Sequence, residues 1–386
     1  MRFTLLSAAL PFCLITLGAC ASEKAEDNGT VRAEPADESG IDGLAARDPA
    51  PGQSAEVDIP DAEQRPLMQA QVVLERLGFG PGVIDGKQGL SFANALKGFQ
   101  ESRDLPITGE LDDATRDALS QWDNIPATRV VTIPSAWGQV PFSAVPDGMA
   151  EKAKVTQLGY ESMAEKLAER FHTTPAVLAQ LNPGGKPASA DGAAGASAAA
   201  SPDGSVPQFA AGQKLRVPNV GADAIDAASV QNKEWLATLQ SLGVGTDQPE
   251  VARILVDESE GWLKAFDGED RLVAMFTVTT GSKQDPLPIG DWKVKGVAYN
   301  PPYAFDPELF WDVPDTAEKQ QLPPGPNGPV GVVWIDLTKD HYGIHGTPSP
   351  ETIGRTESHG CVRLTNWDAA RLAEMVSGST AVEFRR

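Results

Sequence analysis

The chain has 386 residues, a formal net charge of −21 and an isoelectric point near 4.6. This negative charge argues against a nucleic-acid-binding protein, and against docking on an anionic membrane through basic patches. The length fits two or three domains, and the 31 prolines and 37 glycines indicate many turns and linkers.

Residues 1–19 have the pattern of a secretory signal. Arg2 supplies the positive charge, and an apolar segment follows from Phe3 to Leu17. This segment is too short for a comfortable transmembrane helix. Residues 20–60 are rich in Ala, Asp, Glu, Gly and Pro and lack apolar periodicity, so we expect a disordered acidic tether there.

Cys20 ends this signal in the run Leu17-Gly18-Ala19-Cys20, which resembles a bacterial lipobox. The resemblance implies that Cys20 becomes a diacylated first residue and anchors the protein in the periplasm to a bacterial membrane. An ordinary cleavage site after Ala19 is the alternative. Ala21 stands where an aspartate would indicate inner-membrane retention, so sorting to the outer membrane is the expectation.

Residues 61–122 predict three short helices. Apolar residues recur there at helical spacing, and turn residues separate the groups. The landmarks Asp85-Gly86 and Phe99-Gln100 resemble those of the three-helix peptidoglycan-binding domain. The resemblance implies a small all-α domain that binds the cell-wall glycan, whereas a generic helical spacer is the alternative.

Residues 154–219 predict two helices and a closing strand. One helix carries Met163, Leu167 and Phe171 on one side, and a second follows Thr174. This pattern resembles a degenerate LysM module of the α+β class. The usual Gly-Asp-Thr-Leu opening is missing, so retained glycan binding and a structural linker both stay open.

Two further features of this module follow from its sequence. Residues 184–207 are an Ala/Gly/Ser-rich low-complexity run, which indicates a disordered surface insertion. His172 lies at a helix end of the module, where we expect a solvated or packed histidine rather than a ligand.

Residues 250–386 predict a mostly-β domain, a sandwich or a capped sheet. It follows a helix expected at Asn232–Leu242, and its strands are expected near residues 253–256, 262–266, 271–280, 292–297 and 330–337. One helix is predicted late in this domain, with a capping box at Thr365 and an end at Gly378. Residues 299–329 form a long, proline-rich and aromatic segment, which we expect to be a lid over an active site.

The segment from His345 to Arg363 holds two of the four histidines and one of the three cysteines. Because Cys13 lies in the signal and Cys20 is expected to be acylated, Cys361 is the one thiol left in the exported chain. Exported proteins tend to pair their cysteines, so this unpaired thiol indicates a chemical role.

The residue types around Cys361 fit nucleophilic acyl transfer. A cysteine thiol is mostly protonated at neutral pH and needs a base. His345 is the better candidate, because the glycine that follows it allows a backbone carbonyl to orient its ring, whereas His359 adjoins the nucleophile in sequence. Gly360 permits backbone angles that aim the Cys361 N–H at an oxyanion.

Two more residues of the segment have expected roles. Ser358 is expected to orient His359 or the base, and the Arg363 guanidinium offers a fork suited to a carboxylate. A zinc site made of His341, His345, His359 and Cys361 is disfavoured, because residues four apart on a strand lie about 13 Å apart. We therefore expect no metal and no cofactor.

The pattern His-Gly-Thr at residue 345 followed by Ser-His-Gly-Cys-Val-Arg-Leu at residue 358 resembles the signature of the L,D-transpeptidase (YkuD/ErfK-type) catalytic domain. Upstream segments at residues 287–292, 323–327 and 342–344 resemble the family too. The resemblance implies that His345 is the proton acceptor, with support from His359 and Gly360. It also implies a set of substrate-binding residues, namely Tyr342, Gly346, Ser358 and Arg363.

The family resemblance implies an enzyme of the cell wall. Cys361 would attack a tetrapeptide stem of peptidoglycan, release D-alanine and hold the stem as a thioester. An amine of a neighbouring stem, or of a cell-wall protein, would then accept the acyl group. Hydrolysis of the same bond by a carboxypeptidase or endopeptidase is one alternative, and a non-catalytic cell-wall-binding lipoprotein is another. The order of histidine before cysteine disfavours a papain-like peptidase.

Overall fold

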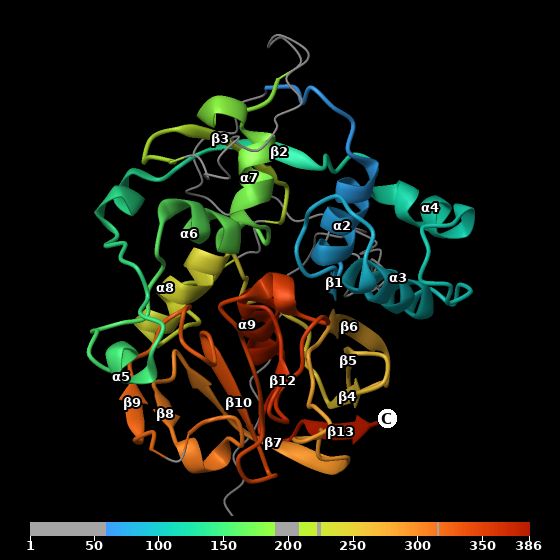
Figure 1. Ribbon diagram of the computed structural model, residues 1–386. Coiled ribbons are helices and arrows are strands. Elements are labelled where there is room, and N and C mark those ends of the chain that lie inside the picture. Colours follow the sequence, from blue (N-terminus) through green and yellow to red (C-terminus); the bar gives the residue numbers. More distant parts are fainter. Residues whose placement is uncertain (1–58, 190–207, 222–224, 315) are drawn as a thin grey trace, which may run out of the picture. The chain divides into compact units, whose positions relative to one another are not determined.

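The computed structural model describes residues 59–189, 208–221, 225–314 and 316–386 (Figure 1). The expected signal, Cys20 and nearly all of the expected tether lie outside these residues, as does most of the expected insertion at 184–207. None of the helices in the described part of the chain is long and apolar enough to span a membrane.

The first described region is helical, as predicted. It contains α2 (Pro66–Arg76), α3 (Leu90–Ser102) and α4 (Asp113–Leu119), followed by the short 3-10 helix η1 (Ser120–Trp122). Pro66 occupies the first turn of α2, where its missing N–H costs nothing. The Asp112 carboxylate caps α4 by accepting from the Thr115 N–H.

The helical region also contributes a strand to the large C-terminal sheet, which the sequence did not indicate. Strand β1 (Phe79–Gly80) pairs in parallel with β6 (Leu272–Thr277) at the edge of that sheet. Gly78 precedes it with a φ of +93°, and a Cβ there would lie 2.7 Å from the carbonyl oxygen of Val273. The turn residues between the first two helices, expected only to separate them, therefore also attach this region to the sheet.

The second region contains the helices and the closing strand that the sequence predicted. They are α6 (Met163–Arg170), α7 (Pro175–Leu181) and β3 (Lys214–Pro218). Strand β3 pairs with β2 (Thr128–Thr132), an antiparallel partner that lies before residue 154, where we expected the module to begin. The assignment of this region to the LysM class stays a prediction.

Short elements connect these regions. They are η2 (Ser135–Gln139), α5 (Met149–Lys152) and η3 (Pro183–Gly185).

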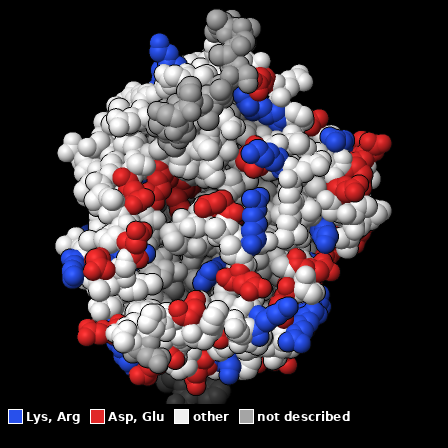
Figure 2. Space-filling model, viewed as in Figure 1, with Lys and Arg blue, Asp and Glu red and all other residues white. Residues whose placement is uncertain are grey.

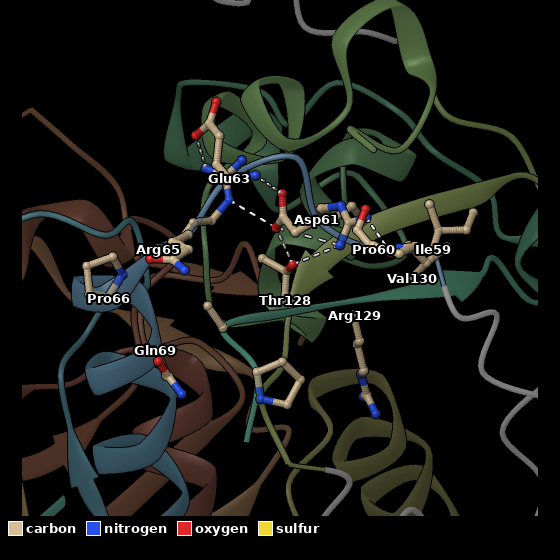
Figure 3. Close-up of a pocket in the computed structure, with 14 residues that line it drawn as sticks. Ile59, Pro60, Asp61, Glu63, Arg65, Pro66, Gln69, Thr128, Arg129 and Val130 are labelled. Atoms are coloured by element: carbon tan, nitrogen blue, oxygen red, sulfur yellow. Dashed lines mark hydrogen bonds and ion pairs between the residues drawn. The ribbon is translucent and has the colours of Figure 1, made fainter. Parts of the chain in front are cut away.

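A polar cavity of about 610 Å³ lies between α2 and the β2–β3 ribbon. Figure 3 shows the Asp61 carboxylate there, accepting from the Arg65 guanidinium at 3.1 Å and from the Thr128 hydroxyl at 2.6 Å. Arg216 of β3 donates to the main-chain oxygens of Ile59 and Pro60. These contacts hold the start of the described chain against the ribbon.

The C-terminal region is built on a nine-stranded sheet, which confirms the mostly-β expectation. The strand order is β1-β6-β5-β4-β13-β7-β10-β11-β12. The strands not yet named are β4 (Arg253–Asp257), β5 (Trp262–Phe266), β7 (Gly290–Tyr299), β10 (Val333–Leu337), β11 (Gly343–His345), β12 (Val362–Arg363) and β13 (Ala381–Arg385).

Two helices cover this sheet. Helix α8 (Lys233–Leu242) begins at an Asn232 cap, and α9 (Asn366–Met375) packs against β10, β11 and α8. Thr365 is the N-cap, as predicted, because its hydroxyl accepts from the Asp368 N–H at 3.1 Å. The Asp368 carboxylate accepts from the Thr365 hydroxyl at 2.8 Å, rather than from the Thr365 N–H as in a full capping box. The predicted helix end at Gly378 is wrong, because Val376 already has extended backbone angles (φ −96°, ψ 156°).

The proline-rich segment at 299–329 forms a hairpin rather than an irregular loop. Strand β8 (Tyr303–Phe305) pairs with β9 (Gln320–Leu322), and the 3-10 helix η4 (Pro307–Leu309) lies between them. Phe305 and Leu322 pack with Leu158 in a small apolar cluster. A further 3-10 helix, η5 (Pro350–Thr352), lies in the His345–Cys361 connection.

A buried charged cluster joins the three regions. The Glu75 carboxylate of α2 lies 2.8 Å from Nδ1 of His172, whose Nε2 lies 3.0 Å from the carbonyl oxygen of Leu242. Arg371 of α9 donates to the Glu75 carbonyl oxygen at 2.7 Å. The His172 ring stacks on Trp367, with centroids 5.0 Å apart, so this histidine is packed, as expected.

Candidate active site

Two short parallel strands bring the ends of the motif together. Ile344 of β11 pairs with Val362 of β12, and His345 pairs with Arg363. Residues paired in register point to the same face of a sheet, and side chains alternate along each strand. His345 and Arg363 therefore lie on one face, and Cys361, two residues before Arg363, lies beside them.

The His345 ring is buried and held in one tautomer. The residue is 5 % exposed, and its Nδ1 lies 2.7 Å from the carbonyl oxygen of Gly346. A carbonyl can only accept, so Nδ1 carries the hydrogen and Nε2 is left with a free lone pair. The ring also stacks on Trp334 of the neighbouring strand, at a centroid distance of 5.5 Å.

The surroundings of His345 keep it neutral. Burial lowers its pKa to about 4, and the positive charge of Arg363 acts in the same direction, against a smaller opposite effect of the Gly346 carbonyl. At neutral pH the imidazole is therefore an uncharged proton acceptor.

Cys361 is a free, partly exposed thiol. Its Sγ donates to the carbonyl oxygen of His341 at 3.8 Å, so its proton is not held by the His345 ring in this state. Burial raises the pKa of the thiol, and the opposing effects of the Gly343 backbone and the Arg363 charge are smaller. The resting pair is thus a neutral thiol and a neutral imidazole.

Gly360 and Ser358 shape the turn before Cys361. Gly360 has a φ of +96°, and a Cβ there would lie 2.6 Å from the Tyr342 ring. The Ser358 hydroxyl donates to the Cys361 carbonyl oxygen at 2.6 Å and accepts from the Gly360 N–H at 3.2 Å. Ser358 is only 3 % exposed. Its side-chain hydrogen bonds are within the turn rather than with His359 or His345, which it was expected to orient. Its expected role in substrate binding stays a prediction.

One main-chain donor in this turn faces no acceptor. Among the residues that the structure describes, the N–H of Cys361 makes no hydrogen bond, whereas that of Gly360 is taken by Ser358. A donor at this position can stabilise the negative charge that develops on a carbonyl oxygen when the Cys361 sulfur attacks its carbon.

His359 contacts the hairpin rather than the nucleophile. Its Nε2 lies 3.0 Å from the Asp312 carboxylate, and its ring meets that of Phe310 edge-on at 5.0 Å. Trp311 lies beside it at 6.3 Å. Residues of the 299–329 segment thus cover one side of the motif, as the expected lid would.

Two tyrosines lie close enough to Cys361 to interact with it electrostatically. Burial raises the pKa of Tyr303 to about 12, and the Cys361 thiolate contributes to that shift. The pKa of Tyr342 is raised by burial first and then by Cys361 and Asp285. Tyr342 was expected at the site, but Tyr303 was singled out only as one of the lid aromatics.

Arg363 lies between these groups. Burial lowers its pKa, and the negative forms of Cys361 and Tyr303 counteract that shift. Its Nη1 lies 3.5 Å from the carbonyl oxygen of Glu357. The guanidinium therefore neighbours the thiol, the base and a phenol at once.

Gly346 orients the base and packs against α9. Beyond its carbonyl contact to His345, a Cβ at this position would collide with the Asn366 side chain. Asn366 is fully buried and donates to Glu169 of α6 at 3.3 Å. Burial raises the pKa of Glu169 to about 8. The sequence did not single out Asn366 or Glu169, because 197 residues separate them.

The charges around the site have a mixed pattern. On the face shown in Figure 2, acidic side chains gather near α4 and near α6, and both signs are interspersed over the lower part of the view. No cluster of three or more histidine, cysteine, aspartate or glutamate side chains within the described ranges is arranged to hold a metal ion.

The class of protein follows from two family matches. Residues 252–383 match the family described as "L,D-transpeptidase catalytic domain", and residues 64–119 match the one described as "Putative peptidoglycan binding domain". The chain therefore carries a catalytic domain of the L,D-transpeptidase family, preceded by a peptidoglycan-binding-type domain. Both expected resemblances are confirmed, while the LysM-like part has no such support.

Individual relatives match over shorter stretches. The chain is 49% identical over 59 residues to "Putative L,D-transpeptidase YkuD" of Bacillus licheniformis, which is 15% of this chain and 36% of that protein. It is 48% identical over 61 residues to the protein of the same name from Bacillus subtilis, or 16% of this chain and 37% of that one. These matches thus span little more than a third of each relative.

A solved structure resembles part of the chain. It is described as "L,D-transpeptidase from Mycobacterium smegmatis", is 22% identical, and covers 36% of this chain and 59% of its own, with a TM-score of 0.29.

Proposed function

We propose that this protein is a peptidoglycan L,D-transpeptidase with Cys361 as nucleophile and His345 as base. The observation that carries the proposal is the β11–β12 pairing. It puts a neutral imidazole with a free Nε2 on the same face as the partly exposed thiol of Cys361. The family match of residues 252–383 supports the same reaction class.

The first half of the reaction forms a thioester. His345 Nε2 takes the thiol proton while Sγ attacks the carbonyl carbon between the L-centred diamino acid and the terminal D-alanine of a tetrapeptide stem. The C–S bond forms, and the carbonyl electrons move onto oxygen. When the oxyanion collapses, the C–N bond breaks, and the imidazolium gives its proton to the departing D-alanine amine.

The pKa of about 4 for His345 suits the second of these proton transfers, and it makes the resting ring a weak base toward the thiol. The ring is unprotonated before the attack, and once protonated it is a strong acid toward the leaving amine. The Cys361 N–H is the candidate donor to the oxyanion. Losing one such donor typically costs about 3 kcal/mol of transition-state stabilisation.

The second half transfers the acyl group. An amine of a neighbouring stem, or of a cell-wall protein, attacks the thioester carbon, the C–N bond forms and the C–S bond breaks. The amine proton passes through His345 to the sulfur, which restores the thiol. If water attacks instead, the same site acts as a carboxypeptidase.

The test uses the full chain and purified muropeptides. Mass spectrometry is expected to show a Cys361 adduct and released D-alanine for the wild type, followed by cross-linked products. Cys361→Ala should give neither adduct nor release, and an undiminished adduct in this variant would remove Cys361 from its role. Shortened stems without cross-links would indicate hydrolysis. Binding to sacculi with an unchanged muropeptide profile would indicate a non-catalytic lipoprotein.

We also propose that Cys20 carries a lipid anchor that holds the enzyme at the periplasmic face of the outer membrane. The supporting observation is the run Leu17-Gly18-Ala19-Cys20-Ala21. Full-length Cys20→Ser protein should lose incorporation of labelled fatty acid and leave the membrane fraction. Cys13→Ser, within the signal itself, is the matched control and should keep both. Labelling retained in Cys20→Ser would overturn the assignment.

A further inference from the structure

The first residue of α9 fills the space behind the carbonyl that orients His345. A Cβ added to either Gly346 or Gly331 would collide with Oδ1 of Asn366. The Asn366 amide is therefore packed tightly against both glycine backbones. The Gly346 carbonyl oxygen lies 2.7 Å from Nδ1 of His345. Its position, and with it the orientation of the ring, depends on where the Asn366 amide is held.

Three hydrogen bonds hold the Asn366 amide. Its Oδ1 accepts from the Val332 N–H at 3.3 Å, and its Nδ2 donates to the Pro326 carbonyl oxygen at 3.1 Å and to Oε1 of Glu169 at 3.3 Å. Because Asn366 is 0 % exposed, bulk water does not replace a partner that is lost. Val332 and Pro326 belong to the segment before β10, whereas Glu169 lies 197 residues upstream of Asn366, in α6.

The Glu169 carboxyl has no other hydrogen-bond partner in the part of the chain that the structure describes. The residue is 5 % exposed, and its Oε2 is buried without a partner there. Burial raises the pKa of the carboxyl to about 8, so near pH 7 it is neutral and interacts with Asn366 through a hydrogen bond rather than through charge. A buried acid with one partner costs folding free energy. That cost indicates a role for the contact beyond stability.

A second set of contacts fixes α6 and the residues before it against the same segment. The Leu158 N–H donates to the Pro324 carbonyl oxygen at 2.9 Å, and the Leu158 carbonyl oxygen accepts from the Asn327 N–H at 3.0 Å. Nδ2 of Asn327 donates to Oε1 of Glu165 at 2.6 Å. A Cβ on Gly325 would collide with the Leu158 main chain. Helix α6 is therefore anchored to the catalytic domain independently of the Glu169–Asn366 contact.

We propose that Glu169, which lies outside the catalytic domain, is a positioning residue for the base His345 and acts through Asn366. This inference rests on the proposed transpeptidase function. The Glu169 oxygen fixes the Asn366 amide, the amide packs against the Gly346 backbone, and the Gly346 carbonyl holds the hydrogen on Nδ1 of His345. Nε2 then keeps the lone pair that takes the thiol proton. Without the Glu169 oxygen the Gly346 carbonyl shifts, and the ring exchanges between its two tautomers.

The kinetic experiment compares two substitutions at Glu169 in the full chain. Glu169→Met removes the acceptor oxygen with little change in side-chain size, and Glu169→Gln keeps an acceptor oxygen. A small displacement of a catalytic group costs up to about a hundredfold in rate, so Glu169→Met should acylate Cys361 about 10- to 100-fold more slowly. Glu169→Gln should stay within about twofold of the wild type. The KM for the tetrapeptide donor should not change in either variant, because neither removes a substrate contact.

Nitrogen NMR of histidine-labelled protein reports the tautomer of His345 without any chemistry. The wild-type ring, assigned with His345→Gln, should show a protonated Nδ1 and an unprotonated Nε2. In Glu169→Met the two signals should move toward each other, because tautomer exchange averages them. Glu75→Gln is the matched control, since it alters another buried carboxyl in contact with α9, at Arg371. It should lose stability and keep both the His345 signals and the acylation rate per folded molecule.

A double variant tests the path through Asn366. Asn366→Ser breaks the same hydrogen bond from the α9 side and should slow acylation at least as much as Glu169→Met. Combining the two should add at most about a further twofold, because residues that act through one contact are not additive. Effects that multiply would show that Glu169 does not act through Asn366 and would overturn the proposal.

The remaining outcomes also decide the proposal. Wild-type His345 signals and a wild-type acylation rate in folded Glu169→Met would overturn it. If that variant does not fold, the same result in Asn366→Ser would overturn it. If the wild type forms no Cys361 adduct, the transpeptidase proposal fails, and the NMR comparison still decides whether Glu169 positions the ring.

Discussion

The chain holds two buried histidines in similar packing but opposite electrostatic surroundings. His345 is 5 % exposed and stacks on Trp334, and His172 is 2 % exposed and stacks on Trp367. His172 has an acceptor at each nitrogen, one of them a carboxylate. His345 has an acceptor at Nδ1 only, and its charged neighbour is Arg363.

The difference shows that the hydrogen-bond partners of a buried histidine, together with burial and neighbouring charge, decide what it can do. His172 has an acceptor near each ring nitrogen, so both nitrogens are engaged and the ring bridges the Glu75 carboxylate and the Leu242 carbonyl oxygen. The Arg363 charge disfavours a second hydrogen on His345, so its Nε2 keeps a lone pair for proton transfer. The first histidine joins regions of the fold, and the second is available for chemistry.

The largest expected effect is on activity. His345→Gln removes the proton acceptor, so acylation of Cys361 should fall by about 10²- to 10⁴-fold. Because Gln is neutral and similar in size, the folded fraction should change little. Stopped-flow acylation and circular dichroism measure the two quantities. His172→Gln is the matched control: it should retain acylation per folded molecule and lose stability, and a reversed pattern would contradict the division of roles.

The next effect is on stability. Glu75→Gln leaves the buried His172 ring and the Arg371 guanidinium without the carboxylate between them, which should lower the free energy of unfolding by about 3–5 kcal/mol. Chemical denaturation followed by tryptophan fluorescence measures the change. Glu63→Gln removes an exposed ion pair with Arg65 in the same region and should cost at most about 1 kcal/mol. Equal losses in the free energy of unfolding would show that the buried cluster stabilises the fold no more than an exposed ion pair does.

The stability contributions of two buried groups, His345 and Glu169, should change with pH in opposite directions. The pKa of His345 is about 4 in the folded protein, against 6.5 for an unperturbed histidine, so the unfolded chain binds the extra proton first. Its contribution to stability is therefore lost as pH falls from 6.5 to 4, by up to about 3 kcal/mol. Glu169, whose pKa is raised to about 8, binds its proton first in the folded state. Stability from Glu169 is thus lost as pH rises from about 4.5 toward 8.

Thermal unfolding across about pH 4 to 8 tests this opposition. His345→Gln should flatten the acidic side of the stability profile, and Glu169→Gln should flatten the alkaline side. If His345→Gln instead changed the alkaline side of the profile, or Glu169→Gln the acidic side, then burial would not be the cause of the two pKa shifts.

Local sequence signals located the helices of the fold and part of the active-site motif, but not the contacts between distant segments. Caps at Asp112, Thr174 and Thr365 fix helix starts because a side-chain oxygen meets an N–H two or three residues away. The orientation of His345 was also predictable, because its carbonyl partner is the next residue. Such signals lie within one turn of the chain and need no knowledge of the fold.

Other contacts carried no local signal. Strand β1 is only two residues long, and its pairing with β6 joins residues nearly two hundred positions apart. The Glu75–His172 pair spans 97 residues, and each residue alone looks like an ordinary polar position. Ser358 was misjudged for a related reason, because its bond to the Cys361 carbonyl depends on the positive φ of Gly360.

The smallest expected effect concerns His359. Like His172 it has a carboxylate partner, but its ion pair is partly exposed to solvent. The partner is Asp312, and 30% and 44% of the two side chains are accessible. Such pairs contribute at most about 1 kcal/mol, so Asp312→Asn should change acylation by about fivefold or less. The effect should shrink at high salt, because screening weakens exposed charge pairs. Steady-state acylation at low and high ionic strength measures this effect. A salt-independent loss of about a hundredfold would exceed what such a pair supplies, and it would show that His359 takes part in the chemistry.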